Sequence, residues 1–212
     1  GIRDIGVTGV QTCALPISMA SSWDSPWDVV VVGSGAAGLM ACLELPPGLR
    51  VLLLSKDSAP RSASRWAQGG IAAVTAAEDS FASHRDDTLL AGAGLCDLPA
   101  VELLVHEAPS CVRRLLELGM AFDRDGSRLS TTLEAAHSHR RVLHAQDRTG
   151  GALVDALERN VLARPGLEQR KGVIALKLWV DGGQCRGLQV LEGSRIGWIR
   201  ARAVVLATGG GG

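Results

Sequence analysis

Residues 29–39 read VVVVGSGAAGL, and this stretch decides the fold. Its four valines form a continuous β-branched apolar run, which is typical of a strand buried on both faces of a parallel sheet. Residues 33–38, GSGAAG, follow at once, and an apolar helix pattern comes next. This is the G-x-G-x-x-G turn between a strand and a helix, and in that context it predicts a dinucleotide-binding βαβ unit.

Each glycine of the turn has its own physical task. Gly33 permits the tight turn, Gly35 lets a pyrophosphate approach the backbone, and Gly38 lets the helix lie close to the strand. The first N–H groups of the helix and the positive end of its dipole then hold the phosphates. Short glycine loops also join strands to helices without a ligand, so a plain structural turn is the alternative. Asp28, the valine run and the helix pattern favour nucleotide binding.

The composition is that of an ordinary globular domain. The 212 residues are 46% hydrophobic and 21% charged. Lys plus Arg and Asp plus Glu number 22 each, so the net charge is zero and favours neither nucleic acid nor an anionic membrane as partner. No apolar run approaches the ~20 residues of a transmembrane helix. The chain has five cysteines: Cys13, Cys42, Cys96, Cys111 and Cys185. Their number is odd and they form no C-x-x-C pair, so we expect reduced thiols, with Cys42 in the core.

Residues 1–18, GIRDIGVTGVQTCALPIS, show neither helical nor strand periodicity. They lack the basic start and the uninterrupted apolar middle of a secretion signal. The segment closely resembles a translated sequencing adapter, so we expect it to be non-native and Met19 to be the natural start. A natural disordered leader is the alternative.

The first helix is expected from Ala36 to Leu45, where Pro46-Pro47-Gly48 stops it. Residues 51–55, VLLLS, predict a second buried strand. In an ordinary NAD or FAD unit an acidic residue ends this strand and binds the ribose hydroxyls. Here Ser55 and Lys56 stand at that point, and a basic residue there favours a 2′-phosphate and hence NADP, although a single lysine is weak support.

Residues 57–73 show no periodicity and are rich in small and polar side chains. A long irregular loop of this kind usually serves a ligand, and small side chains let backbone amides approach a flat ring; an ordinary surface loop is the alternative.

Pro109 is expected to break or kink a later helix, and residues 123–126 predict a turn. The helices expected after the loop span Ser80–Gly92 and Asp97–Gly119, each with its first residue as N-cap, and Gly151–Ala163.

From Leu167 onward the pattern changes to strands. Three alternating segments with glycine turns between them predict a small antiparallel meander: 173–180, 185–191 and 197–202. Residues 203–207, AVVLA, predict a last buried strand that runs into Thr208. The fold we expect is therefore α/β and Rossmann-like, with a mostly parallel sheet covered by helices and an added antiparallel β-meander.

Five segments, in this order, resemble the flavoproteins of the succinate dehydrogenase/fumarate reductase group: VVVVGSGAAGL (29–39), LLSK (53–56), WAQGGIAAV (66–74), EAAHSHRRVLHAQDRTG (134–150) and AVVLATGG (203–210). The first and last are shared widely among flavoproteins, whereas AQGGIAAV and HSHRRVLHA are far more specific. The resemblance implies FAD as the cofactor. The Ser-Lys pair at 55–56 is the group's own variant, which removes most of the case for NADP.

The resemblance also implies which residues contact FAD. Val173 would lie against the adenine and Thr208-Gly209 would pass near the cofactor, whereas Trp66 departs from the side chain usual in the group. The expected cofactor-binding residues are Gly33, Ser34, Gly35, Ala36, Ala37, Gly38, Ser55, Lys56, Ala63, Ser64, Arg65, Trp66, Ala67, Gln68, Gly69, Gly70, Val173, Thr208 and Gly209.

Position 63 separates the members of the group. The respiratory flavoproteins place a histidine there and bond it covalently to the flavin. Ala63 cannot form that bond, so the resemblance implies non-covalent FAD and favours the L-aspartate oxidases within the group.

Glu134 also separates the members of the group. L-aspartate oxidases resemble this chain in placing a glutamate shortly before the H-S-H-R-R run. The Gly-Gly that follows this glutamate in the group is replaced by Ala135-Ala136 here. A carboxylate in a site built for two substrate carboxylates favours a substrate ammonium by charge pairing. The implied reaction is oxidation of L-aspartate to iminoaspartate, with oxygen or fumarate as acceptor. The product would pass to quinolinate synthase for NAD synthesis in the cytoplasm.

The spacing of His137, His139 and His144 would suit a metal, but no carboxylate or cysteine ligand is obvious nearby, and Arg140 and Arg141 oppose a cation. We expect no metal, and we assign these histidines to positioning the loop against flavin or substrate.

Members of the group continue far beyond Gly212 through a capping domain, and the residues that hold substrate carboxylates and move protons lie there. We therefore expect residues 19–212 to be the N-terminal part of an FAD-binding domain, truncated and inactive by itself. Two alternatives remain: a fragment of a succinate dehydrogenase or fumarate reductase flavoprotein, and a non-catalytic nucleotide-binding module.

Overall fold

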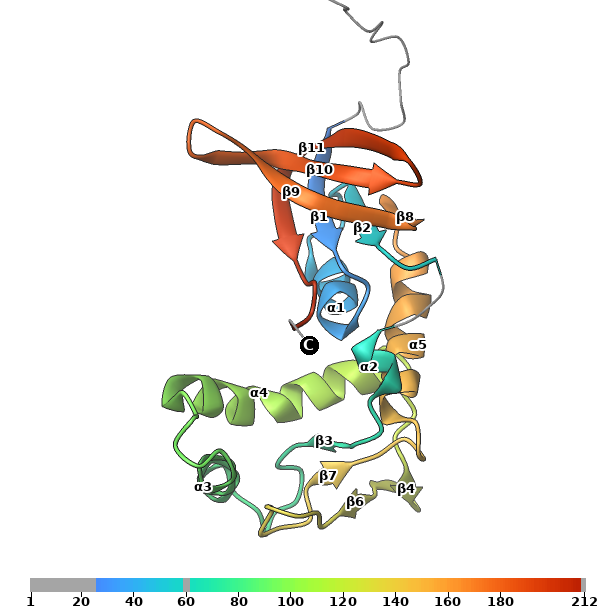
Figure 1. Ribbon diagram of the computed structural model, residues 1–212. Coiled ribbons are helices and arrows are strands. Elements are labelled where there is room, and N and C mark those ends of the chain that lie inside the picture. The colour runs from blue at the N-terminus through green and yellow to red at the C-terminus, as the bar shows by residue number, and fades with distance from the viewer. Residues whose placement is uncertain (1–25, 59–61, 211–212) are drawn as a thin grey trace, which may run out of the picture.

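The computed structural model describes residues 26–58 and 62–210. The expectations for residues 1–18, including Cys13, and for Met19 lie outside this part of the chain. The described chain has an upper part of long strands and a lower part of helices α3 and α4 with short strands, and helix α5 runs between the two (Figure 1). The helices are α1 (Ala36–Glu44), α2 (Ala63–Trp66), α3 (Phe81–Ala91), α4 (Leu98–Glu117) and α5 (Thr149–Leu162).

The long strands form one six-stranded sheet in the order β8-β2-β1-β11-β10-β9. Their bounds are β1 (Trp27–Val32), β2 (Val51–Ser55), β8 (Leu167–Lys171), β9 (Val173–Asp181), β10 (Gln184–Glu192) and β11 (Arg195–Leu206). Strands β8, β2, β1 and β11 are mutually parallel, and β11, β10 and β9 are antiparallel. The expected α/β fold with a mainly parallel sheet and a meander is confirmed.

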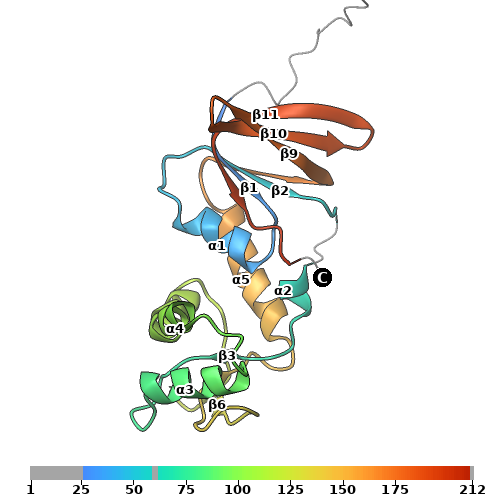
Figure 2. The ribbon, with the colours of Figure 1, turned by 60° about the vertical axis from the view of Figure 1, so that its left-hand side comes forward.

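Both faces of β1 and β2 are buried, as the valine run predicts. Val29 and Val31 contribute to one core together with residues of α1, α4 and α5. Val30 and Val32 point to the other side, into a second core with residues of β9, β10 and β11. The result is three layers: the meander, the parallel strands, and the helices α1 and α5 (Figure 2). Cys42 lies in the first core, where burial raises the pKa of its thiol to about 11.

Strand β11 joins the two kinds of sheet, and its length corrects the sequence prediction of two separate strands. Its first half pairs with β10 from Arg195 to Arg200, and its second half pairs with β1 from Ala201 to Leu206. The alternation at 197–202 and the apolar run at 203–207 therefore belong largely to one strand. The expected burial of that run is wrong, because Ala203 and Leu206 are exposed. Strand β8, LEQRK, was not predicted, because an edge strand with polar side chains shows no apolar pattern.

Two further expectations are corrected in the middle of the chain. Helix α4 runs without interruption through Pro109, so the predicted break is wrong. The loop at 57–73 is not wholly irregular, because it contains the single-turn helix α2 and the short strand β3. Ser62 caps α2, accepting a hydrogen bond from the N–H of Arg65. The N-caps Ser80 and Asp97 are confirmed by their bonds to the backbone of α3 and α4.

Five short strands complete the lower part. A three-stranded sheet has the order β3-β7-β6, and a hairpin of β4 and β5 turns at 126–127, slightly later than the turn predicted at 123–126. The bounds are β3 (Ile71–Ala72), β4 (Arg124–Asp125), β5 (Arg128–Leu129), β6 (Thr131–Thr132) and β7 (Val142–Leu143). None of the helices in the described ranges is long and apolar enough to cross a membrane.

Candidate functional site

The glycine turn lies at the carboxyl end of β1, where a neighbouring strand comes very close. Gly33 has a φ of +112°, and a Cβ there would lie 2.1 Å from the carbonyl oxygen of Ala207. A Cβ on Gly38 would lie 1.9 Å from the carbonyl oxygen of Gly33. Both positions therefore require glycine, for the turn and for helix–strand packing respectively, as the motif predicts.

Gly35 is different, because no backbone atom beyond its own chain neighbours stands within 4 Å of where its Cβ would be. A Cβ there would meet only the Ser64 hydroxyl oxygen, at 3.3 Å. Gly35 is the N-cap of α1 and, as a glycine, makes no side-chain bond to that helix end. The Ser64 hydroxyl accepts a hydrogen bond of 3.1 Å from the N–H of Ala36. The further N–H groups of the first helical turn have no acceptor within their own helix. This open, donor-rich cradle fits the pyrophosphate of a dinucleotide.

The segment 62–70, which we call the arm, is fixed beside this cradle by helix α5. Arg65 forms ion pairs with Asp155 at 2.7 Å and with Glu158 at 3.4 Å. The N–H of Gly150 donates to the carbonyl oxygen of Ala67, and a Cβ on Gly150 would lie 2.0 Å from a carbonyl oxygen of the arm. Gln68 and Gly69 are exposed, and the Trp66 side chain is 71% exposed. The arm therefore keeps its shape while several of its residues remain open to a ligand.

Most of the expected cofactor residues meet at one edge of the parallel sheet. The N–H of Gly33 donates to the carbonyl oxygen of Leu54, which places the turn beside Ser55 and Lys56 at the end of β2. Thr208 and Gly209 follow β11 directly, on the opposite side of the turn. This is the edge at which open α/β sheets bind ligands. Val173 stands two residues after Lys171, which pairs with Ser55 at the end of β2, and its side chain is buried in the second core at the start of β9.

Glu134 and His144 lie together in the lower part. The Nε2 atom of His144 is 2.8 Å from Oε1 of Glu134 and 2.9 Å from Oγ1 of Thr132. Gly70 lies against the same histidine ring, because a Cβ on Gly70 would be 2.9 Å from its Cε1 atom. The short β3-β7-β6 sheet thus brings the expected substrate residue, Glu134, next to the end of the arm.

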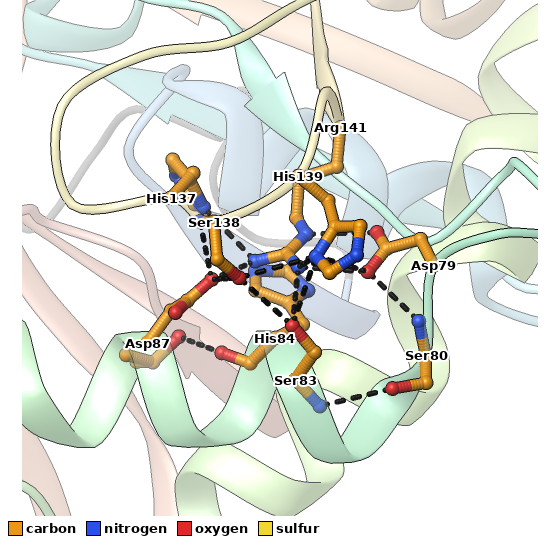
Figure 3. A network of polar contacts seen from close by, with 10 residues as sticks. Asp79, Ser80, Ser83, His84, Asp87, His137, Ser138, His139 and Arg141 are labelled. Atoms are coloured by element: carbon orange, nitrogen blue, oxygen red, sulfur yellow. Dashed lines mark hydrogen bonds and ion pairs between the residues drawn. The ribbon is translucent and has the colours of Figure 1, made fainter.

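Arg141 is the centre of a buried polar network that joins the loop 137–141 to helix α3 (Figure 3). Its guanidinium is fully buried and donates to both carboxylate oxygens of Asp79, at 2.7 and 2.8 Å. It also pairs with Asp87. The N–H and hydroxyl of Ser138 donate to the same Asp87 oxygen, both at 2.8 Å. The network fixes the loop that leads into β7 and His144.

The network changes the titration of its members. Hydrogen bonds from Arg141 hold the pKa of Asp79 below its ordinary value. Burial raises the pKa of Asp87, but hydrogen bonds from Ser138 and Arg141 outweigh it and lower this pKa to about 2. Burial and the adjacent Arg141 lower the pKa of His84. Sequence reasoning missed these partners of Arg141, and the only signal was the density of polar residues from Asp79 to Asp87.

Within the described ranges, no group of three or more His, Cys, Asp or Glu side chains could hold a metal ion. His137 and His139 instead face Arg141, with ring nitrogens 3.3 and 3.4 Å from its guanidinium. The four described cysteines are unpaired: Cys42, Cys96, Cys111 and Cys185.

The family profile described as FAD binding domain matches residues 28–212. The chain belongs to the FAD-binding domain family. FAD is therefore the cofactor of this domain. The match begins at the residue before the valine run and includes the turn, the arm and the loop 137–141.

Two curated relatives are similar to this FAD-binding chain over nearly all of its length. An L-aspartate oxidase of Nostoc is 53% identical over 190 residues, which are 89% of this chain and 33% of the relative. An L-aspartate oxidase of Synechocystis is 55% identical over 188 residues, which are 88% of this chain and 34% of the relative. The chain thus spans about a third of the length of these relatives.

Solved structures of this FAD-binding fold are similar as well. A quinol fumarate reductase of E. coli matches with a TM-score of 0.83 and 32% identity, over 89% of this chain and 33% of that chain. The Sdh1 complex of Mycobacterium smegmatis matches with a TM-score of 0.82 and 30% identity, over 87% of this chain and 34% of that chain. The resemblance to the succinate dehydrogenase/fumarate reductase group is confirmed.

Proposed function

We propose that the gene product containing this chain is an FAD-dependent L-aspartate oxidase. The observation that carries the proposal is the position of Glu134, whose carboxylate lies at His144 beside the end of the arm. Similarity to named L-aspartate oxidases at 53% and 55% identity supports it. A succinate dehydrogenase or fumarate reductase activity is less favoured, because a dicarboxylate without an amine has no use for this carboxylate.

The chain would hold FAD without a covalent bond. In our proposal the backbone at Gly35 and the first turn of α1 receive the pyrophosphate, and Ser55 and Lys56 lie at the ribose. The arm from Ala63 to Gly70 would lie behind the flavin ring. Ala63 begins helix α2 with a methyl side chain, which offers no nucleophile to the flavin. Bound FAD supplies the two-electron acceptor for a hydride.

Glu134 would bind the substrate ammonium by direct charge pairing. L-Aspartate then loses a hydride from Cα and a proton from its nitrogen, which gives iminoaspartate. Oxygen takes up the two electrons and two protons as hydrogen peroxide, or fumarate takes them up as succinate. In this scheme the product passes to quinolinate synthase, and the reaction takes place in the cytoplasm.

The test is to express the full reading frame that contains this chain and to assay the purified yellow protein with three substrates. We expect hydrogen peroxide with L-aspartate, and little or none with D-aspartate or succinate. Fumarate should replace oxygen under anaerobic conditions, with one succinate formed for each aspartate consumed. Turnover of succinate with no turnover of L-aspartate would contradict the proposal and would favour the respiratory alternative.

A further inference from the structure

His144 lies between two parts of the candidate site that are far apart in sequence. On one side its Nε2 atom is 2.8 Å from the Glu134 carboxylate. On the other side its ring rests against Gly70, at the end of the arm. Its backbone is also fixed, because its carbonyl oxygen accepts a hydrogen bond of 2.8 Å from the N–H of Asp123. The ring therefore has little freedom to move away from Glu134.

The neighbouring hydroxyl determines which ring nitrogen carries the proton. Thr132 Oγ1 lies 2.9 Å from Nε2 of His144, and its own hydrogen is directed to the carbonyl oxygen of Val142 at 3.4 Å. The hydroxyl therefore presents lone pairs to Nε2, as the Glu134 carboxylate does. Two acceptors at one nitrogen require that nitrogen to carry hydrogen, so Nε2–H is the donor.

The bond to His144 constrains a side chain that would otherwise be mobile. The Glu134 side chain is 43% exposed and stands between strand β6 and the turn at 135–136, and among the described residues its ion pair is with His144. Ordering a glutamate only when substrate arrives costs binding energy, and ordering it in advance avoids that cost. The contact uses Oε1, so Oε2 stays available to a ligand.

We propose that His144 is a positioning residue that holds Glu134 through its Nε2–H and thereby sets the preference for a substrate that carries an ammonium group. This inference rests on the proposed function, since it assigns Glu134 to the substrate amine. His144 itself does not touch the substrate. His144 connects the end of the arm to Glu134, so that the arm behind the flavin and the site for the substrate amine keep a fixed position relative to each other.

The test compares His144→Phe, His144→Gln, Glu134→Gln and the double variant His144→Phe/Glu134→Gln in the full gene product. Phenylalanine keeps the ring volume without a donor, and the glutamine amide restores an N–H. For His144→Phe we expect kcat/KM for L-aspartate to fall by about tenfold to a hundredfold, as for the loss of one hydrogen bond to a charged group. The loss should appear mainly in KM.

Three accompanying results are expected. His144→Gln should recover much of the lost kcat/KM, and any residual turnover of succinate should fall less than turnover of L-aspartate in every variant. The double variant should be no worse than Glu134→Gln alone, because the two residues act as one unit. ¹⁵N spectra of histidine-labelled protein should show the Nε2–H form of His144 in the unmodified protein.

The positioning role would be overturned if His144→Phe lowered kcat/KM equally for L-aspartate and succinate. It would also be overturned if the losses of the two single variants added in the double variant. In both cases the proposed function would stand. An Nδ1–H form of His144 would overturn it as well. Absence of L-aspartate turnover in the unmodified protein would overturn the proposed function, and the amine-selecting role of His144 with it.

Discussion

At the scale of single residues, the glycine turn shows how close packing at one point determines what a site can bind. Gly33 and Gly38 are enclosed by backbone, whereas a Cβ on Gly35 between them would meet only the Ser64 hydroxyl oxygen. The same three-glycine motif therefore contains two residues that serve packing and one, Gly35, that we propose serves the ligand. The roles that the motif assigns to Gly33 and Gly38 are visible in the geometry of this chain.

Gly38→Ala tests the packing role. The added methyl group would meet the carbonyl oxygen of Gly33 at 1.9 Å, and neither backbone segment can move without shifting α1 from β1. We expect a loss of about 1–3 kcal/mol or more in the free energy of unfolding, measured by urea denaturation of the full gene product.

Gly48→Ala is the matched control, because a Cβ there meets nothing within 4 Å. This control should change the stability by no more than about 0.5 kcal/mol. Equal stability of the Gly38 variant and the control would show that helix α1 is not held as closely as described.

At the scale of elements, the Arg141 network anchors the loop 137–141 to helix α3 and so places β7. A fully buried guanidinium is tolerated only when its charge is paired, and here Asp79 and Asp87 pair it. Because β7 is hydrogen-bonded to both β3 and β6, the anchored loop also fixes the end of the arm and the approach to Glu134.

This network predicts a loss of stability in acid. Asp79 and Asp87 have folded-state pKa values below the ordinary 3.8, and that of Asp87 is about 2. As the pH falls below about 4, the unfolded chain takes up protons that the folded chain does not, so unfolding becomes more favourable. The contribution of both groups is fully present above that pH and is lost progressively as the pH approaches their folded pKa values.

Urea midpoints measured from about pH 6 down to about pH 2 would follow this loss. Asp87→Asn should be less stable at the upper end, because it leaves Arg141 with a weaker partner, and it should also show a shallower dependence on pH. An unchanged slope in this variant would mean that Asp87 does not carry the acid sensitivity.

Sequence patterns predicted the elements whose burial is one-sided or complete, and missed those that depend on distant partners. The β1 run, helix α1 and the caps Ser80 and Asp97 follow from local physics. Strand β8 is polar and becomes a strand only because β2 offers it an edge, and β11 changes partner in mid-strand. The ion pairs of Arg141 join residues 54 and 62 positions apart in sequence, which no local pattern can show.

At the scale of the whole molecule, the described chain combines two structures with different tasks. In our proposal the layered sheet and α1 form the cradle for the dinucleotide, and the lower part presents Glu134 at the end of the arm. Helix α5 and the arm connect them through the Arg65 ion pairs and the bond from Gly150 to Ala67. The central claim is that this assembly seats an FAD that no covalent bond holds.

Acid precipitation of the purified full gene product tests this claim most directly. The protein is denatured with trichloroacetic acid, and flavin is measured in the supernatant and in the pellet. Because Ala63 offers no group for a bond, we predict that a yellow protein releases all of its flavin, as FAD, into the supernatant. A colourless protein, a nicotinamide nucleotide in place of FAD, or flavin that stays with the pellet would contradict the account.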